Sequence, residues 1–150
     1  YVGGGLSPSS KSGVNYNCDH IQKSALQIDF EARRVMIDQN HKLIANIDNI
    51  IAASNNAIAA EWHSHWRQAG YDYREDHKER DKVVYLIRGN WAQKNGYVKV
   101  GPSGYLDEIT QPGEEVFCRC YVTYLYNLRS IPEHMLTQKG QKFMASMKSA

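Results

Sequence analysis

Two stretches of the 150-residue sequence, YREDHKERD (Tyr73–Asp81) and EVFCRCY (Glu115–Tyr121), decide how the rest of the chain is interpreted. The first carries a histidine, two arginines and several acids. The second carries two of the three cysteines, with an arginine between them. The sequence before them is typical of helix, and the sequence between them is typical of short strands and turns. Together they could form a metal site, a catalytic site or a polar clasp that closes a small fold.

Length and composition indicate one globular domain with a modest core. A hydrophobic fraction of 42% and a charged fraction of 23% are ordinary. The net charge of +2 does not mark a nucleic-acid-binding protein. Cys18, Cys118 and Cys120 do not resemble the disulfide framework of a secreted protein, so a reducing compartment is expected. No apolar run of about 18 residues is present, and no membrane segment is expected.

Four segments follow from the composition along the chain. Residues 1–18 are rich in glycine and serine, which bury little surface, and are expected to form a flexible arm. Residues 19–70 are expected to be helical, with Asp19 as the N-cap and Gly70 at the C-terminal end. A small β-rich module is predicted for residues 71–130. A C-terminal helix or tail is predicted for residues 131–150. The predicted fold class is α+β: a long N-terminal helix or helical hairpin, a small antiparallel β-rich module and a short C-terminal helix.

Large apolar residues recur at helical spacing through the predicted helix, in steps that average about 3.67 residues. The rest of the chain is too small to cover a helix of this length. Part of the stripe is therefore expected to meet another chain, and a helix pair around a local core is the alternative. Asn55 lies on the same stripe as a register-setting polar residue or a tolerated defect. The predicted interaction helix carries Ile44, Ile47, Ile51, Ile58, Trp62 and Trp66.

Cys118 and Cys120 are two positions apart, so both side chains would lie on one face of a strand. Zinc accepts cysteine and histidine ligands in a tetrahedron, and His77 is the candidate that would join them. His63 and His65 are further candidates, although they diverge from each other on a helix. The alternative is a pair of buried structural cysteines, because free cysteine behaves as a small hydrophobe. The predictions are therefore no cofactor or, as a tentative site, zinc on His77, Cys118 and Cys120.

The charged residues around this site predict a structural clasp. A carboxylate from Glu114 or Glu115 could form a two-pronged ion pair with one of the nearby arginines and tie the two stretches together without any reaction. The predicted clasp consists of Arg74, His77, Arg80, Asp81, Glu115 and Arg119.

Catalysis is the competing interpretation of the same residues. His77 with Asp76 or Asp81 could form a general base or activate a metal-bound water. No nucleophile elbow or phosphate-binding loop accompanies them. No catalytic residue is therefore assigned, and the chain is not expected to be an enzyme.

The order of these motifs resembles the C-terminal module of the Mu F-like minor head proteins of tailed bacteriophages. The resemblance covers roughly residues 62–124, and a long helical segment precedes the module in that family. One departure is Lys82, which stands where the family usually has glycine after aspartate. A second is the short length of the helical part. The residues that carry the resemblance are Arg74, His77, Asp81, the approach Pro112–Glu115, and Cys118, Arg119 and Cys120, with further similarity in His77–Asp81, Ile87–Ala92 and Asp107–Glu115.

The resemblance implies a virion structural protein, a minor head or portal-associated protein that assists head assembly or genome delivery. It would be located in the capsid interior or at the portal vertex, and in the host cytoplasm during assembly. Its partners would be portal or capsid proteins and copies of itself, with no membrane. The lysines after Glu133 allow non-specific contact with packaged DNA, and a solvated helix face is the simpler interpretation. A metal-dependent hydrolase acting on nucleic acid is the alternative function.

Overall fold

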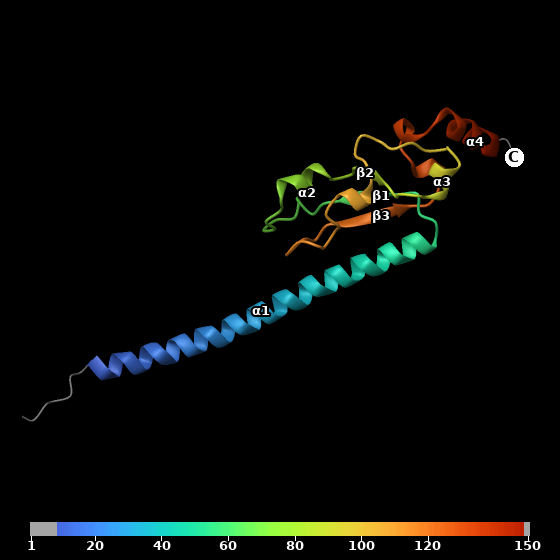
Figure 1. Cartoon of the computed structure of the whole chain (residues 1–150). Coiled ribbons are helices and arrows are strands. Elements are labelled where there is room, and N and C mark those ends of the chain that lie inside the picture. Colours follow the sequence, from blue (N-terminus) through green and yellow to red (C-terminus); the bar gives the residue numbers. More distant parts are fainter. Residues whose placement is uncertain (1–8, 149–150) are drawn as a thin grey trace, which may run out of the picture. The chain divides into compact units, whose positions relative to one another are not determined.

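The computed structural model describes the backbone of residues 9–148 and the side chains of residues 27–147. The chain divides into two compact units, Tyr1–Ile37 and Asp38–Ala150, and the boundary falls within helix α1. The second unit contains all three strands and every helix after α1 (Figure 1). The predicted α+β class is confirmed: a long N-terminal helix, a small antiparallel sheet and a short C-terminal helix are all present.

Helix α1 spans Ser9–Ser54 and differs from the prediction at both ends. It begins inside the segment predicted to be a flexible arm, because one interior glycine, Gly13, costs a helix only about 1 kcal/mol. The first eight residues of that arm lie outside the described part of the chain. The predicted helix of residues 19–70 is therefore wrong in both its start and its end.

The end of α1 is set by two asparagines. Asn56 has a left-handed backbone, with φ of 60°, and asparagine is one of the few residues other than glycine that adopts it readily. The backbone N–H of Asn56 donates to the carbonyl of Ala53, and that of Ala57 donates to the carbonyl of Ala52. This pair of bonds is the Schellman motif, which terminates helices. Asn55, predicted as a polar residue of the helical stripe, lies in this helix end.

The sheet contains β1 (Ala59–His63), β2 (Val84–Leu86) and β3 (Tyr121–Leu125) in the order β2-β1-β3, and all pairings are antiparallel (Figure 1). The central strand β1 lies within the predicted helix. Ile58 and Trp62 are fully buried next to and within β1, so they do not continue the helical stripe. Trp66 lies in a turn after β1. The prediction of a helical stripe through these three residues is wrong, because the chain reverses after Asn56.

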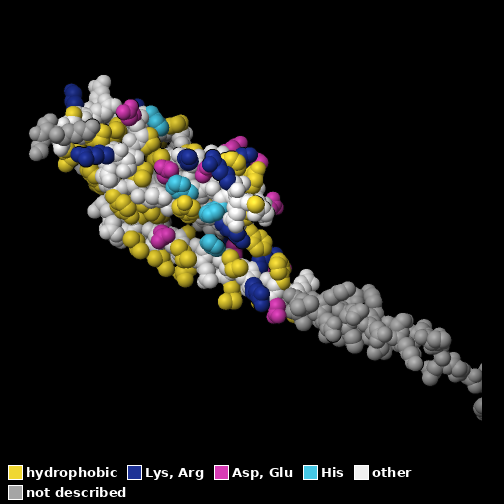
Figure 2. All heavy atoms as spheres, turned by 180° about the vertical axis from the view of Figure 1, so that it is seen from behind, with side chains coloured by type: hydrophobic (Ala, Val, Ile, Leu, Met, Phe, Trp, Pro, Cys, Tyr) yellow, Lys and Arg dark blue, Asp and Glu magenta, His cyan; other side chains and the backbone are white. Residues whose placement is uncertain are grey.

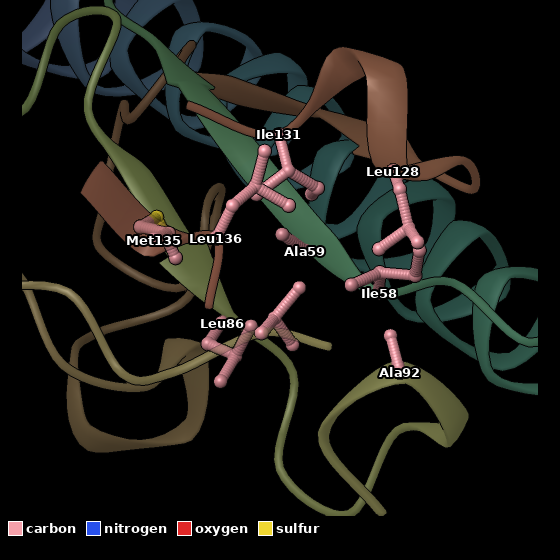
Figure 3. Packing of buried hydrophobic residues seen from close by; sticks show 9 residues of the cluster. Ile58, Ala59, Leu86, Ala92, Leu128, Ile131, Met135 and Leu136 are labelled. Atoms are coloured by element: carbon pink, nitrogen blue, oxygen red, sulfur yellow. The ribbon is translucent and has the colours of Figure 1, made fainter. Parts of the chain in front are cut away.

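Alternate residues of β1 and β2 enter two different cores, as expected for a sheet with both faces covered. Ala59 and Leu86 belong to one cluster, and Ala60, Trp62 and Tyr85 belong to the other. Figure 3 shows the first cluster, in which the chain after β3 covers the sheet with Leu128, Ile131, Met135 and Leu136. The second cluster includes Leu106, Cys118 and Cys120. The two cysteines are thus part of a hydrophobic core.

Short helical segments connect and follow the strands. They are α2 (Glu75–Glu79), α3 (Trp91–Lys94), η1 (Leu106–Glu108), η2 (Leu128–Ser130), η3 (Glu133–Met135) and α4 (Gln138–Lys148). Around Tyr97–Val100 the β-rich module has only a single bridge, between Val98 and Leu136. The last two residues of the predicted C-terminal helix lie outside the described part.

The part of α1 in the second unit is fastened to the sheet module by a few specific contacts. Asp38 Oδ1 accepts the backbone N–H of Phe117 at 3.2 Å, and the Tyr124 hydroxyl donates to Asn49 Oδ1 at 3.5 Å. A Cβ on Gly113 would lie 3.3 Å from the carbonyl group of His41, so glycine allows the loop to approach the helix. Within the described residues, no helix is both long enough and apolar enough to span a membrane.

Candidate metal site

Two parts of the second unit supply the site. Helix α2 lies in the connection between β1 and β2, and its third residue is His77, which is 2% exposed. Cys118 and Cys120 lie just before β3 and are 2% and 6% exposed. Arg119 between them is exposed. Both thiols therefore point into the protein, in the hydrophobic cluster that contains Ala60 and Trp62, while the intervening arginine points to solvent.

The three side chains converge. His77 Nδ1 lies 3.5 Å from the sulfur of Cys118 and 3.5 Å from the sulfur of Cys120. Their ligand atoms all lie within 4.8 Å of one another. One imidazole nitrogen and two thiolates are a donor set that zinc and other thiophilic metals accept. The group could therefore bind a metal ion.

Backbone N–H groups surround the two sulfurs. The N–H of Gly113 donates to Cys118 Sγ at 3.5 Å. The pKa of Cys118 is lowered to about 5, mainly because the Cys120 thiol donates a hydrogen bond to it, and also by the backbone N–H groups of Gly113 and Cys120. The pKa of Cys120 is raised, because its thiol is the donor in this hydrogen bond to Cys118 and because it is buried. The lowered pKa of Cys118 favours its thiolate, the form in which cysteine binds metals.

The other nitrogen of His77, Nε2, has a different environment. It is buried and has no hydrogen-bond partner among the described residues. The nearest acidic oxygens are Glu115 Oε2 at 3.5 Å and Asp76 Oδ2 at 3.8 Å. Glu115 is in turn held by Arg74, whose Nε lies 2.7 Å from the same oxygen. The imidazole therefore faces two sulfurs on one side and two carboxylates on the other.

The predicted clasp residues do not all meet at this point. Arg74, His77 and Glu115 are in contact, as the preceding distances show. Arg80, which follows the last residue of α2, pairs with Asp76 of that helix, with Nη2 3.0 Å from Oδ2. Arg119 lies over the ring of Tyr71, 5.5 Å from its centroid, and is exposed rather than locked in the interior.

Asp81 fastens the end of β1 rather than joining the metal donors. Its carboxylate accepts the backbone N–H of Ser64 at 2.9 Å and the indole N–H of Trp66 at 3.1 Å. His63 and His65 also stay apart from the site. The ring of His63 is stacked on Tyr121, with centroids 4.8 Å apart, and His65 lies near the same ring.

Sequence reasoning missed two residues that hold the cysteine loop. Tyr71 donates from its hydroxyl to the carbonyl of Phe117 at 3.0 Å and accepts the backbone N–H of Arg119 at 3.1 Å. Asp38 accepts the N–H of Phe117 from helix α1, as described above. Neither residue belongs to a motif, and Asp38 lies 79 positions from its partner. Only the three-dimensional structure brings them to the loop.

The predicted interaction residues fall into two groups. Ile44, Ile47 and Ile51 lie on α1 and are 57%, 45% and 49% exposed. The other three, Ile58, Trp62 and Trp66, belong to the sheet module, where Trp66 packs against Tyr73 with ring centroids 6.5 Å apart. Hydrophobic side chains reach the surface on the face of the molecule that Figure 2 shows.

No model of a known protein family, no curated protein and no solved structure matches this chain.

Proposed function

We propose that the chain is a structural protein of a tailed bacteriophage virion, a minor head or portal-associated protein that assists head assembly or genome delivery. This class of protein is proposed because of the resemblance in sequence. It is supported by the way in which the residues that carry the resemblance lie together: Arg74 reaches Glu115, and His77 faces Cys118 and Cys120. A motif whose distant parts meet in space is expected to serve a common purpose.

One observation supports an assembly role above others: α1 carries large apolar side chains that remain exposed among the residues the structure describes. Within residues 38–54 they recur at spacings of one, three and four and are between 45% and 66% exposed. Soluble proteins rarely expose such a row of aliphatic side chains on one element unless it meets a partner. We propose that this surface binds portal or capsid protein, or a second copy of the chain. It consists of Leu43, Ile44, Ile47, Ile50 and Ile51.

We further propose that the metal held by His77, Cys118 and Cys120 is zinc and that its role is structural. Zinc prefers sulfur and nitrogen ligands, and structural zinc sites stabilise small modules that have modest cores. All three ligands are nearly inaccessible to solvent, which suits a structural ion better than one that receives a substrate. The site would close the loop before β3 onto helix α2.

The competing function is a metal-dependent hydrolase acting on nucleic acid. In its favour, three protein ligands leave a fourth coordination position, as in catalytic zinc sites. The burial of the ligands opposes it, because a phosphodiester needs an accessible ion and the three ligand residues are only 2–6% exposed. Cleavage of plasmid DNA by the purified protein with added Zn²⁺, abolished by His77→Ala, would favour the hydrolase.

The proposal is tested by locating the protein in purified phage particles and measuring its copy number. It is expected to be present at a defined stoichiometry that fits the portal vertex, and to disappear from particles when Ile47→Asp and Ile50→Asp are combined. Asn40→Asp combined with Asn46→Asp is the matched control, since the pair adds the same two charges at exposed polar positions of the same helix. A protein absent from wild-type particles would contradict the proposal. Equal incorporation of both variants would contradict the helix as the binding surface.

A further inference from the structure

Nε2 of His77 is a buried polar atom that has no hydrogen-bond partner in the part of the chain that the structure describes, and this is unusual in a native fold. Its ring is fixed by the second nitrogen, Nδ1, which lies 3.5 Å from both sulfurs. When Nδ1 carries the metal-binding lone pair, the proton of the neutral ring must be on Nε2. A metal-bound His77 therefore presents a buried N–H donor toward Asp76 and Glu115, and this donor requires an acceptor.

Glu115 is placed to be that acceptor. Its Oε2 is 3.5 Å from Nε2, closer than the 3.8 Å of Asp76, and its side chain is 33% exposed against 53% for Asp76. Its backbone carbonyl accepts the N–H of Cys118 at 3.0 Å, so Glu115 is fixed relative to a metal ligand. Asp76 Oδ2 is already paired with Arg80, whose Nη2 lies 3.0 Å away.

Arg74 determines where the Glu115 carboxylate lies. Its Nε is 2.7 Å from Glu115 Oε2, and its Nη2 donates to the carbonyl of Val116 at 3.1 Å. The guanidinium thus holds both the side chain and the backbone of the loop that leads to Cys118. A shift of a few tenths of an ångström would bring the carboxylate into hydrogen-bond range of Nε2 without breaking this pair.

We propose that Glu115 is the positioning residue of the metal site: its carboxylate, held by Arg74, accepts the Nε2–H of His77 and so keeps Nδ1 facing the two sulfurs. Carboxylates commonly play this part behind metal-ligating histidines, where they fix the ring orientation and raise its basicity. The inference rests on the proposed metal-binding role of His77, Cys118 and Cys120. It adds a residue that touches no metal but determines how well the metal is held.

The test compares Co²⁺ and Zn²⁺ affinity in the full chain, measured by competition with a chromophoric chelator, for the wild type and three variants. Glu115→Gln is expected to weaken binding 10- to 100-fold. Glu114→Gln is the matched control, because that neighbouring side chain caps the N–H of Gln111 and does not approach His77; it should bind as the wild type does. Asp76→Asn tests the other carboxylate and should have a much smaller effect than Glu115→Gln.

A second measurement determines which nitrogen of the His77 imidazole carries the proton. Long-range ¹H–¹⁵N spectra of the metal-free protein should show His77 protonated on Nε2 in the wild type and in Glu114→Gln. In Glu115→Gln they should show a mixture of tautomers. A general loss of folding would change the melting temperature and the other histidine signals as well, so the two effects are separable.

Equal affinity and an unchanged tautomer in Glu115→Gln would overturn the role of Glu115, as would a larger loss in Asp76→Asn. A wild type that binds neither ion would overturn the metal proposal instead. In that case the tautomer measurement still reports whether Glu115 orients the ring.

Discussion

At the scale of single residues, Lys82 lies where the backbone favours glycine. It is the third residue of a turn in which the N–H of Val83 donates to the carbonyl of Arg80 at 2.9 Å, and its φ is 63°. The lysine that departs from the Asp-Gly pattern in the sequence therefore keeps the backbone conformation that glycine adopts without strain. The sequence shows which residue stands at this position, but only the structure shows that its backbone is left-handed.

Lys82→Gly is expected to raise the free energy of unfolding by about 0.5–1 kcal/mol. Relief of left-handed strain contributes about 1–2 kcal/mol, and the added freedom of the unfolded chain offsets part of it. Urea denaturation measures the change. Lys82→Ala is the control, because it removes the same exposed side chain and keeps the strain. A glycine variant no more stable than the alanine variant would contradict this account.

Asp81, in the same turn, makes the stability depend on pH. Its pKa is lowered first by the backbone N–H of Ser64 and then by the indole N–H of Trp66. A carboxyl whose pKa is lower in the folded than in the unfolded state stabilises the folded protein. The stabilisation is complete above the unfolded-state pKa of about 3.9, and it is lost as the pH falls through the folded-state pKa. Urea denaturation at pH 7 and pH 3 should show a smaller loss for Asp81→Asn than for the wild type. An equal loss in the two proteins would contradict the assignment.

At the scale of elements, the helix end and the central strand show what the sequence could and could not predict. The apolar spacing from Ile44 to Ala69 fits a helix throughout, because β1 contributes only five residues and its alternation is too short to compete with the longer pattern. The decisive signal was Asn55-Asn56, and its effect depends on one left-handed residue. Gly70 also has a positive φ but ends a turn rather than α1.

In helix α4, the packing around one glycine predicts a change in stability opposite to the one that helix propensity predicts. Gly140 lies inside it, and a Cβ there would collide with the carbonyl oxygen of Tyr97. Helix propensity alone predicts that Gly140→Ala raises the free energy of unfolding by about 1 kcal/mol. The close packing predicts a destabilisation of about 1–3 kcal/mol instead. Thermal unfolding decides the sign, and Gln141→Ala at the next, exposed position serves as the control. A stabilised Gly140→Ala would show that α4 can move away without cost.

At the scale of the whole molecule, the fold class and the meeting of His77, Cys118 and Cys120 could be predicted, because each depends on local patterns or on residue types with narrow chemistry. A histidine and a closely spaced cysteine pair have few common roles, so their meeting could be expected from the sequence. The ion pair of Arg74 with Glu115, and the hydrogen bonds from Asp38 and Tyr71 to the cysteine loop, could not. Arginines, acids and tyrosines are numerous, and many pairings among them fit the same sequence equally well.

Metal removal tests the module as a whole. With zinc present at about a thousand times its dissociation constant, binding adds about 4 kcal/mol to the stability, which corresponds to a shift of roughly 10 °C in melting temperature for a chain of this size. A strong chelator should remove that stabilisation, and re-added Zn²⁺ should restore it. His77→Ala should melt at the lower temperature with or without chelator. Elemental analysis that finds no stoichiometric metal in protein purified without chelator would contradict the prediction.

The separation of the metal-binding residues along the chain has a consequence for folding. His77 and the two cysteines are about forty residues apart, and the Asp38–Phe117 bond that steadies their loop closes a still longer segment. Contacts between distant residues form late, because the entropy of closing the intervening chain must be overcome first. The site is therefore expected to form late, when the pairing of β3 with β1 has brought the two cysteines beside His77. Ion capture would then act as a final step that retains a module already formed, rather than as a nucleus around which it folds.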